Sequence, residues 1–313
     1  QRQVEISGPD AAQLIQYLTT RDVSKTKIGQ GRYVPICNHE GMLINDPVLL
    51  KLASDRYWLS IADSDIELWA SAIAAERGWN VRVFEPDVSP LAIQGPKAES
   101  LVADLFGPRV KEFKYFGFEQ TELQGIPLVL ARSGWSKQGG FELYLQDGSR
   151  GDELWEKIMA AGEPFGLKPG HTSSIRRIEG GMLSYHADAD INTNPYELGF
   201  DRLVNLDIVA DFIGKAALRR IKEEGPFSGG RVQSSVPGAR YTFAPLIAHE
   251  DNPGVIELRQ DFGGSVSAAI VYDDKLEVRM SLFEYRRDRR CYHVSAIIGR
   301  HYYRHLLFVA RKR

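Results

Sequence analysis

Residues 131–143, with the sequence ARSGWSKQGGFEL, tell more about this chain than any other stretch. One apolar run ends at Ala131 and an alternating apolar run starts at Phe141, which predicts two strands joined by a polar, glycine-rich turn. Trp135 lies on that turn, where it either presents a flat face to a ligand or caps a small core; its residue type leaves both interpretations open. Glu142 follows as a fixed hydrogen-bond acceptor.

The composition is that of an ordinary globular protein. The chain has 313 residues, 43% hydrophobic and 26% charged, which is enough for two or three domains with their own cores. A formal net charge of −2 gives no reason to expect nucleic acid or an anionic membrane as a partner. Cys37 and Cys291 form neither a zinc pattern nor a disulfide scaffold, which favours a reducing, cytoplasmic setting. No apolar run approaches the length of a membrane span.

Residues 1–88 alternate strands and helices in the order typical of a ferredoxin-like α+β module. A strand that includes Val4 and Ile6 precedes a helix capped by Asp10, and a later helix is capped by Ser64. Helical spacing predicts buried faces formed by Ala11, Leu14, Ile15 and Leu18 in the first helix and by Leu68, Trp69, Ala72 and Ile73 in the second. The other predicted strands are Arg32–Ile36, Leu43–Leu52, Tyr57–Ala62 and a strand with Val81 and Val83.

A second α+β module is predicted for residues 89–228, and it contains the Trp135 turn. Its order loosely repeats that of the first module, so two related modules are expected. Leu91–Gln94 is its first strand, and helices are predicted after Gly95-Pro96, over Gly151–Ala161 and over Thr172–Met182. From residue 229 to 313 the pattern is less regular, and Val255–Leu258 and Val266–Tyr272 predict a small β-rich domain.

Asn45 and Asp46 are adjacent on a predicted strand, so only one of them can face a given cavity. The alternative is an ordinary pair that closes a turn.

Further along the chain, four residues are candidates for a ligand site. Arg177 and Glu179 lie two apart on a predicted helix, so they point in different directions and each needs its own partner. Tyr185 follows the end of that helix. Glu197 lies on a turn between apolar neighbours and is either solvated or holds the donors of a ligand, because an unpaired buried carboxylate is costly.

The chain lacks the sequence motifs of several classes of protein. There is no P-loop and no Ser-based nucleophile elbow. His293, His301 and His305 have no cysteine or carboxylate support, so no metal site is expected. The last 28 residues, from Arg286, carry nine Lys or Arg and one acid, but no motif supports nucleic-acid binding there.

Five motifs, in the right order, resemble those of the glycine-cleavage T-protein family, the folate-binding aminomethyltransferases. They are Val4–Ala11, Ala92–Pro96, Arg132–Trp135, Arg177–Glu179 and Phe212–Lys215. Within that family the chain most resembles the dimethylsulfoniopropionate demethylases, at Asn45–Val48, Ile61–Asp65 and Ala131–Glu142. The resemblance covers roughly residues 2–225; the chain from about residue 229 matches the family poorly, and family members carry a further segment before the position of Gln1.

The resemblance implies a T-protein-like, multidomain α+β fold with ferredoxin-like modules around a central folate channel and a small C-terminal β domain. It implies a tetrahydrofolate-dependent methyltransferase that moves a methyl group from the sulfonium of dimethylsulfoniopropionate to N5 of tetrahydrofolate and leaves methylmercaptopropionate. The implied partners are the sulfonium and folate, without nucleic acid, membrane or metal, and a homodimer stays open. By position, the implied catalytic residues are Trp135, Tyr185 and Asn45, and the implied folate-binding residues are Trp135, Glu142, Glu179, Glu197 and Arg177.

One departure from the aminomethyltransferases favours a sulfonium donor. Those enzymes place an Asp where Asn45 stands, and that Asp serves chemistry in which the protons of an amine must be managed. A sulfonium is permanently charged and leaves as a neutral thioether, so positioning and exclusion of water can supply most of the acceleration, and an aromatic face such as that of Trp135 can hold the cation. A folate-dependent enzyme with an amine donor and a non-enzymatic folate-binding relative stay as alternatives. The carboxylate of the substrate has three candidate partners: Arg32, Lys137 and Arg202.

Overall fold

The computed structural model describes residues 2–62, 65–171 and 174–224, apart from the side chains of Ser174, Ile175 and Glu179. Of the later residues it describes the backbone of three strands; the predicted cap Ser64 and the basic stretch from Arg286 lie outside the described residues. The chain divides into two compact units, residues 1–228 and 229–313. No helix in the described ranges is long and apolar enough to cross a membrane.

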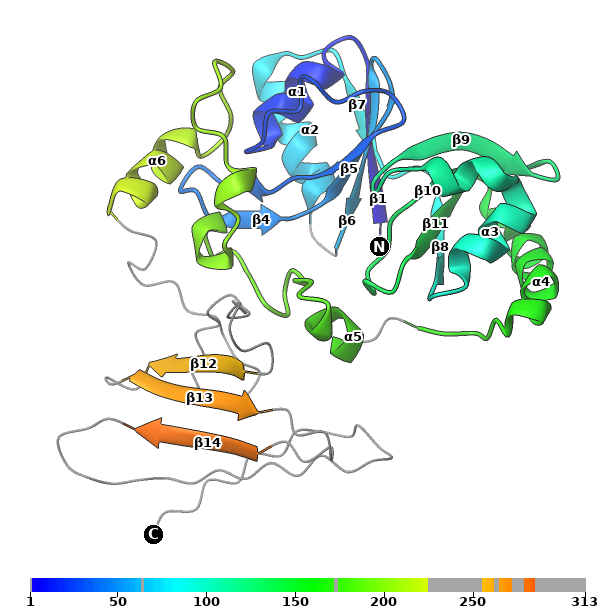
Figure 1. Cartoon of the computed structure of the whole chain (residues 1–313). Helices are drawn as coiled ribbons and strands as arrows, with labels where there is room; N and C mark the ends of the chain where they lie inside the picture. The colour runs from blue at the N-terminus through cyan, green and yellow to red at the C-terminus, as the bar shows by residue number, and fades with distance from the viewer. Residues whose placement is uncertain are drawn as a thin grey trace. The chain divides into compact units, whose positions relative to one another are not determined.

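The first module is a five-stranded antiparallel sheet with two helices on one face (Figure 1). The strand order is β2-β5-β6-β1-β7, in which β5-β6-β1-β7 is the order of a ferredoxin-like sheet and β2 is added at its edge. The elements are β1 (Arg2–Ser7), α1 (Ala11–Leu18), β2 (Gly31–Tyr33), β5 (Val48–Ala53), β6 (Arg56–Ile61), α2 (Ile66–Arg77) and β7 (Arg82–Phe84).

The buried face of α1 is confirmed, whereas that of α2 is only partly right. All four predicted residues of α1 are buried against the sheet. In α2 the buried residues are Ile66, Ala70, Ile73 and Ala74, while Leu68 is 69% exposed. The sequence of α2 carries apolar residues around most of its circumference, so its periodicity does not single out one face.

Asp10 precedes α1 but does not cap it. Its carboxylate makes no bond to the first turn and instead accepts a hydrogen bond from the backbone of Asn80 at 2.7 Å. The side chain therefore ties the start of α1 to the segment before β7.

Prolines break two of the predicted strands. The strand predicted over Arg32–Ile36 is divided into β2 and β3 (Ile36–Cys37), and Pro35 lies between them. The strand predicted over Leu43–Leu52 is divided into β4 (Leu43–Asn45) and β5, with Pro47 between them. Proline cannot donate to a strand ladder, so each break frees the chain to leave the sheet, and β3 and β4 pair with each other as a separate hairpin.

The second module has a four-stranded antiparallel sheet in the order β8-β11-β10-β9. In each module a first strand and a helix are followed by three further strands of the same sheet and then by a second helix. The last of these three strands pairs with the first strand, in agreement with the expected structural repeat. β9 was not predicted, because its sequence FEQTEL is mostly polar and it lies at the sheet edge. The elements are β8 (Ser89–Gln94), α3 (Ala98–Phe106), β9 (Phe118–Leu123), β10 (Ile126–Ala131), β11 (Gly140–Leu145) and α4 (Gly151–Gly162).

The two sheets pack face to face, with their helices on the outer faces (Figure 1). The shared core holds Leu50, Leu52, Trp58, Phe118, Val129, Ala131 and Tyr144. Trp58 and Tyr144 come from opposite sheets, and their ring centroids are 6.2 Å apart. This joint core fixes the Trp135 hairpin, which extends from β10 and β11, relative to the first module.

A third hydrophobic cluster joins the β3–β4 hairpin to residues 185–221. It contains Leu43, Tyr185, Tyr196 and Phe212 and is closed by α6 (Lys215–Glu224). The helix predicted over Thr172–Met182 is shorter, α5 (Ser174–Glu179), because the glycine pair at 180–181 ends it and Gly181 adopts a left-handed φ of +65°. The remaining short elements are 3-10 turns: η1 (Pro108–Glu112), η2 (Gly148–Arg150), η3 (Glu163–Phe165), η4 (Pro195–Leu198) and η5 (Asp201–Leu203).

In the C-terminal unit, the described strands form an antiparallel sheet, β12-β13-β14. They are β12 (Val255–Asp261), β13 (Ser265–Val271) and β14 (Arg279–Glu284), so both strands predicted in this part are confirmed.

Candidate ligand site

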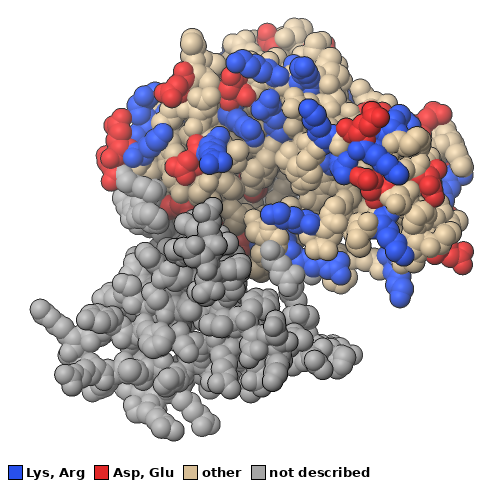
Figure 2. All heavy atoms as spheres, viewed as in Figure 1, with Lys and Arg blue, Asp and Glu red and all other residues tan. Residues whose placement is uncertain are grey.

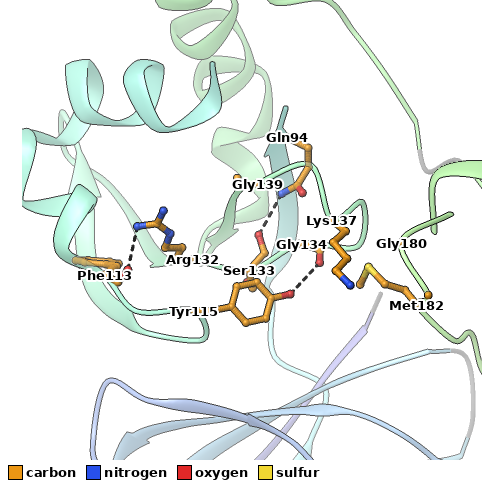
Figure 3. A pocket seen from close by; sticks show the side chains of 12 residues that line it. Gln94, Phe113, Tyr115, Arg132, Ser133, Gly134, Lys137, Gly139, Gly180 and Met182 are labelled. Carbon is orange, nitrogen blue, oxygen red and sulfur yellow. Dashed lines mark hydrogen bonds between the residues drawn. The ribbon is translucent and has the colours of Figure 1, made fainter. Parts of the chain in front are cut away.

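A cavity of about 650 Å³ opens between the Trp135 hairpin and the turn after α5 (Figure 3). Two aromatic side chains, Phe113 and Tyr115, and one thioether, Met182, give it apolar walls. Much of the remaining surface is glycine backbone. The lining residues are Gln94, Phe113, Tyr115, Arg132, Ser133, Gly134, Lys137, Gly139, Gly140, Gly180, Gly181 and Met182.

Gln94 fixes the shape of the hairpin. Its amide nitrogen donates to the carbonyl oxygens of Ser133 at 3.1 Å and Phe141 at 3.3 Å, and its amide oxygen accepts from the Ser136 hydroxyl at 2.7 Å. One side chain from β8 therefore binds both arms of the turn. A Cβ at Gly134 would overlap the same amide, which explains the glycine at that position.

Two of the predicted site residues, Trp135 and Arg177, lie in contact. The guanidinium carbon of Arg177 lies 5.5 Å from the centroid of the Trp135 ring, and the indole nitrogen of Trp135 donates to the carbonyl oxygen of Leu183 at 3.4 Å. The Trp135 ring does not line the cavity itself, but the adjacent Gly134 does. A cation–π contact with Arg177 and a hydrogen bond to Leu183 thus attach the hairpin to α5 and to the chain that follows it.

Arg177 is largely used within the protein. It is buried and forms an ion pair with Asp188, and it also donates to the carbonyl oxygen of Met182 at 3.1 Å. Asp188 accepts a further bond from the backbone of Ser184 at 2.8 Å. The prediction that Arg177 needs a partner other than Glu179 is therefore confirmed, and that partner is Asp188.

Glu142 is buried behind the cavity wall. Its carboxylate accepts from the Ser133 hydroxyl at 2.5 Å and from the Tyr144 hydroxyl at 3.1 Å. Burial raises the pKa of Glu142, and these two hydrogen bonds oppose the rise because they stabilise the charged form. Ser133 lines the cavity, so a ligand there would be one side chain away from a buried acid.

A second group of predicted residues lies around β4. Asn45 is fully buried; its side chain accepts from the backbone of Asp46 at 2.9 Å, while the Tyr185 hydroxyl donates to the carbonyl oxygen of Leu43 at 3.0 Å. The pKa of Tyr185 is raised to about 12 by burial and by the neighbouring carboxylates of Asp190 and Asp46.

Asp46 is the most perturbed acid of this group. The Tyr33 hydroxyl donates to it at 2.5 Å. Burial raises the pKa of Asp46 to about 6, the nearby Asp188 adds to the rise, and the bond from Tyr33 opposes it. Asp188 thus acts on both groups of residues: its charge raises the pKa of Asp46, and it forms the ion pair with Arg177, which lies over Trp135.

Glu197 has a structural part in a capping box. Its carboxylate accepts from the backbone of Asn194 at 2.9 Å, while the Asn194 side chain accepts from the backbone of Tyr196 and Glu197. Glu179 ends α5, and its side chain lies outside the described residues.

Sequence reasoning missed Gln94, Asp188 and the bond between Tyr33 and Asp46. Gln94 ends β8 directly before Gly95-Pro96, and a polar side chain at the end of a strand is a signal for a functional position. Asp188 lies in a long irregular segment, where no periodicity relates it to Arg177.

The family is defined by comparison with known proteins. The model of the GCVT N-terminal domain matches residues 1–208, so the chain belongs to this family. It is similar to the dimethylsulfoniopropionate demethylase DmdA of Ruegeria pomeroyi, with 45% identity over 226 residues, 72% of this chain and 62% of that protein. It is also similar to an aminomethyltransferase of Thermoanaerobacter sp. strain X514, with 33% identity over 229 residues, 71% of this chain and 62% of that protein.

A solved structure shares the fold. The glycine cleavage system aminomethyltransferase T from Bartonella henselae has a TM-score of 0.62 with 22% identity, over 92% of this chain and 80% of that one. The expectation of a T-protein-like α+β fold is thereby confirmed. The matched part of this chain spans 62% of the length of the demethylase and of the Thermoanaerobacter relative.

Proposed function

We propose that the chain is a tetrahydrofolate-dependent demethylase that transfers a methyl group from dimethylsulfoniopropionate to N5 of tetrahydrofolate. The observation that carries the proposal is the 45% identity to the Ruegeria demethylase, against 33% to the Thermoanaerobacter aminomethyltransferase over a similar length. Asn45 supports it, because a neutral side chain stands where the aminomethyltransferases are expected to place an acid.

The cavity suits a ligand of the size of folate. Ligand pockets usually measure about 300–1,000 Å³ and combine apolar walls with a few polar groups, and this cavity of about 650 Å³ has both. Phe113 and Tyr115 would stack on a flat ring, and Ser133, whose hydroxyl donates to the buried Glu142, would lie beside that ring. When bound, tetrahydrofolate supplies the nitrogen that accepts the methyl group.

The sulfonium needs a site that holds a cation without water. One face of the Trp135 ring already has the Arg177 guanidinium above it, and Asp188 neutralises that charge. The rings of Phe113 and Tyr115, which line the cavity, are the better candidates for a cation–π contact worth about 0.5–2 kcal/mol. In this proposal Trp135 orders the hairpin and Phe113 and Tyr115 meet the ligand.

A folate-dependent aminomethyltransferase is the second candidate. An aminomethyltransferase of Bacillus cereus is 34% identical over 262 residues, 81% of this chain and 71% of that protein. Asp46, with its pKa raised to about 6, is an acid able to hold or release a proton near neutral pH, which amine chemistry requires.

The deciding experiment is incubation with tetrahydrofolate and either dimethylsulfoniopropionate or an aminomethyl donor, with 5-methyltetrahydrofolate and 5,10-methylenetetrahydrofolate separated by chromatography. We expect folate-dependent 5-methyltetrahydrofolate from the sulfonium alone. The Asn45→Asp variant is expected to gain no activity with the amine donor, because one carboxylate does not rebuild a site for that donor. Product from the aminomethyl donor alone would favour the second candidate.

The proposal places the enzyme in the cytoplasm with small-molecule partners only. A homodimer stays a prediction, and light scattering of the purified chain would test it.

A further inference from the structure

Two cationic side chains line the cavity, and one of them is already bound. Arg132 donates to the carbonyl oxygens of Lys111 at 3.1 Å and Phe113 at 3.0 Å, and it forms an ion pair with Glu99 at 2.6 Å. These bonds hold the guanidinium against its own module. Three of the five N–H donors of Arg132 are thus bound within its own module, so Arg132 stabilises the cavity wall.

Lys137 is the other cation. It is exposed at the tip of the hairpin, with a left-handed φ of +53°, and no residue that the structure describes forms a hydrogen bond or ion pair with its ammonium group. Figure 3 shows its side chain running from the hairpin toward Met182, on the far wall of the cavity. The positive charge thus lies at the cavity without a protein partner among the described residues.

Gly180 leaves the room for this lysine. A Cβ at Gly180 would come within 2.9 Å of the Lys137 Cβ, closer than real side chains approach. The absence of a side chain at position 180 lets the stem of Lys137 pass between the hairpin and the turn after α5. The ammonium group of Lys137 therefore lies between the Trp135 hairpin and the turn after α5.

The face of the protein in Figure 2 carries basic and acidic side chains interspersed, rather than one basic patch. A surface with charges of both signs gives no reason to expect a polyanion as a ligand on this face. The other two candidates for a carboxylate partner, Arg32 and Arg202, do not line the cavity.

We propose that Lys137 binds the carboxylate of a ligand in this cavity and so selects for carboxylate-bearing ligands. The inference rests on the proposed function for the identity of the ligands, since both proposed substrates carry a carboxylate: the propionate of the sulfonium and the glutamate of folate. An ammonium–carboxylate hydrogen bond is charge-assisted and sensitive to salt.

The test compares Lys137→Gln, Lys137→Arg and the unchanged chain in calorimetric binding of four ligands. Tetrahydrofolate is paired with the carboxamide of tetrahydropteroate, in which NH2 replaces the glutamate and no carboxylate remains, and dimethylsulfoniopropionate is paired with ethyldimethylsulfonium, which lacks the carboxylate. Lys168→Gln is the matched control, because Lys168 is exposed and does not line the cavity. Gln and Arg fill the same left-handed position as Lys, so backbone strain is shared by all variants.

We expect Lys137→Gln to weaken binding of one carboxylate ligand about tenfold and to leave its carboxylate-free partner unchanged, with recovery in Lys137→Arg. Loss confined to the folate pair assigns the site to the glutamate, and loss confined to the sulfonium pair assigns it to the propionate. Equal affinity of Lys137→Gln and the unchanged chain for all four ligands would overturn the assignment. If the unchanged chain bound none of them, the proposed function itself would fail first.

Discussion

At the scale of single residues, the Arg177–Asp188 pair determines how the hairpin meets the rest of the protein. The side chains of Arg177 and Asp188 are only 6% and 17% exposed, so neither charge is well solvated. A buried pair adds little net stability compared with apolar residues, but removal of one partner leaves the other charge uncompensated. Asp188 positions the Arg177 guanidinium, and the guanidinium lies over the Trp135 ring, so the position of that ring depends on Asp188.

Asp188→Asn should lower the free energy of unfolding by about 3 kcal/mol, because it leaves the Arg177 charge buried without its partner. Urea unfolding measures the loss. The double variant Arg177→Met with Asp188→Leu should recover most of it, since both charges are removed together. Asp201→Asn, at an exposed position, serves as the control. If Asp188→Asn and Asp201→Asn lowered the unfolding free energy equally, a buried Arg177–Asp188 pair would be contradicted.

Asp46 should make stability depend on pH in a defined direction. Its pKa is raised to about 6 in the folded protein from a usual 3.8, so between these values the folded state keeps a proton that the unfolded chain has released. Stability from this group is therefore present at low pH, falls as pH rises through that window, and is lost above it. A rise of about two pKa units corresponds to about 3 kcal/mol.

The Asp46→Asn variant removes this dependence. Its unfolding free energy minus that of the unchanged chain should increase by up to about 3 kcal/mol between about pH 4 and pH 7. Asn keeps an oxygen that can accept the Tyr33 hydroxyl bond, so the fold should persist. Asp55→Asn, at an exposed turn, should show no such trend, and a difference for Asp46→Asn that is constant with pH would show that Asp46 is not perturbed.

At the scale of elements, α1 and β11 could be predicted because their apolar residues repeat with a clear period. β10 could be predicted because it is a continuous apolar run that ends at a polar turn. The face of α2 could not, since alanines blur its pattern, and β9 could not, since an edge strand has few apolar residues. The catalytic and folate-binding residues named from the family resemblance stay a prediction, because none of them lines the described cavity. The contacts of Gln94 and Asp188 are tertiary contacts that no local pattern encodes.

The hairpin depends on glycine at one position more than at its neighbour. Gly140 has a φ of +146°, and a Cβ there would overlap the carbonyl oxygen of Ile93 and approach the Gln94 amide. Gly139 has a φ of +77° but open space around it. Because backbone cannot easily move aside, Gly140→Ala should displace β11 from β8.

We expect Gly140→Ala to cost more than about 2 kcal/mol of unfolding free energy and to weaken folate binding, whereas Gly139→Ala should cost only about 1 kcal/mol of unfolding free energy. Thermal unfolding and calorimetry measure the two effects. Equal behaviour of the two variants would indicate that the hairpin is not held against Gln94.

At the scale of the whole molecule, the first unit is built around the contact between two sheets. Trp58 of one sheet and Tyr144 of the other lie in that shared core, and Tyr144 also donates to Glu142 behind the cavity. The cavity wall is therefore coupled to the packing of both modules. A repeat of two similar modules does not by itself require such coupling; the shared apolar core provides it.

The coupling predicts that the two modules unfold together. Trp58→Leu and Tyr144→Leu should be non-additive, with a coupling energy of about 0.5–1.5 kcal/mol from their ring contact. Trp58→Leu combined with Leu101→Ala should instead be additive within about 0.5 kcal/mol, because Leu101 lies in the outer core of the second module. Urea unfolding followed by both fluorescence and circular dichroism measures the cycle. The contrary result would be separate unfolding transitions by the two probes, with additive changes in unfolding free energy for Trp58→Leu and Tyr144→Leu. Each module would then be stable without the other, and the second module alone would form the cavity wall.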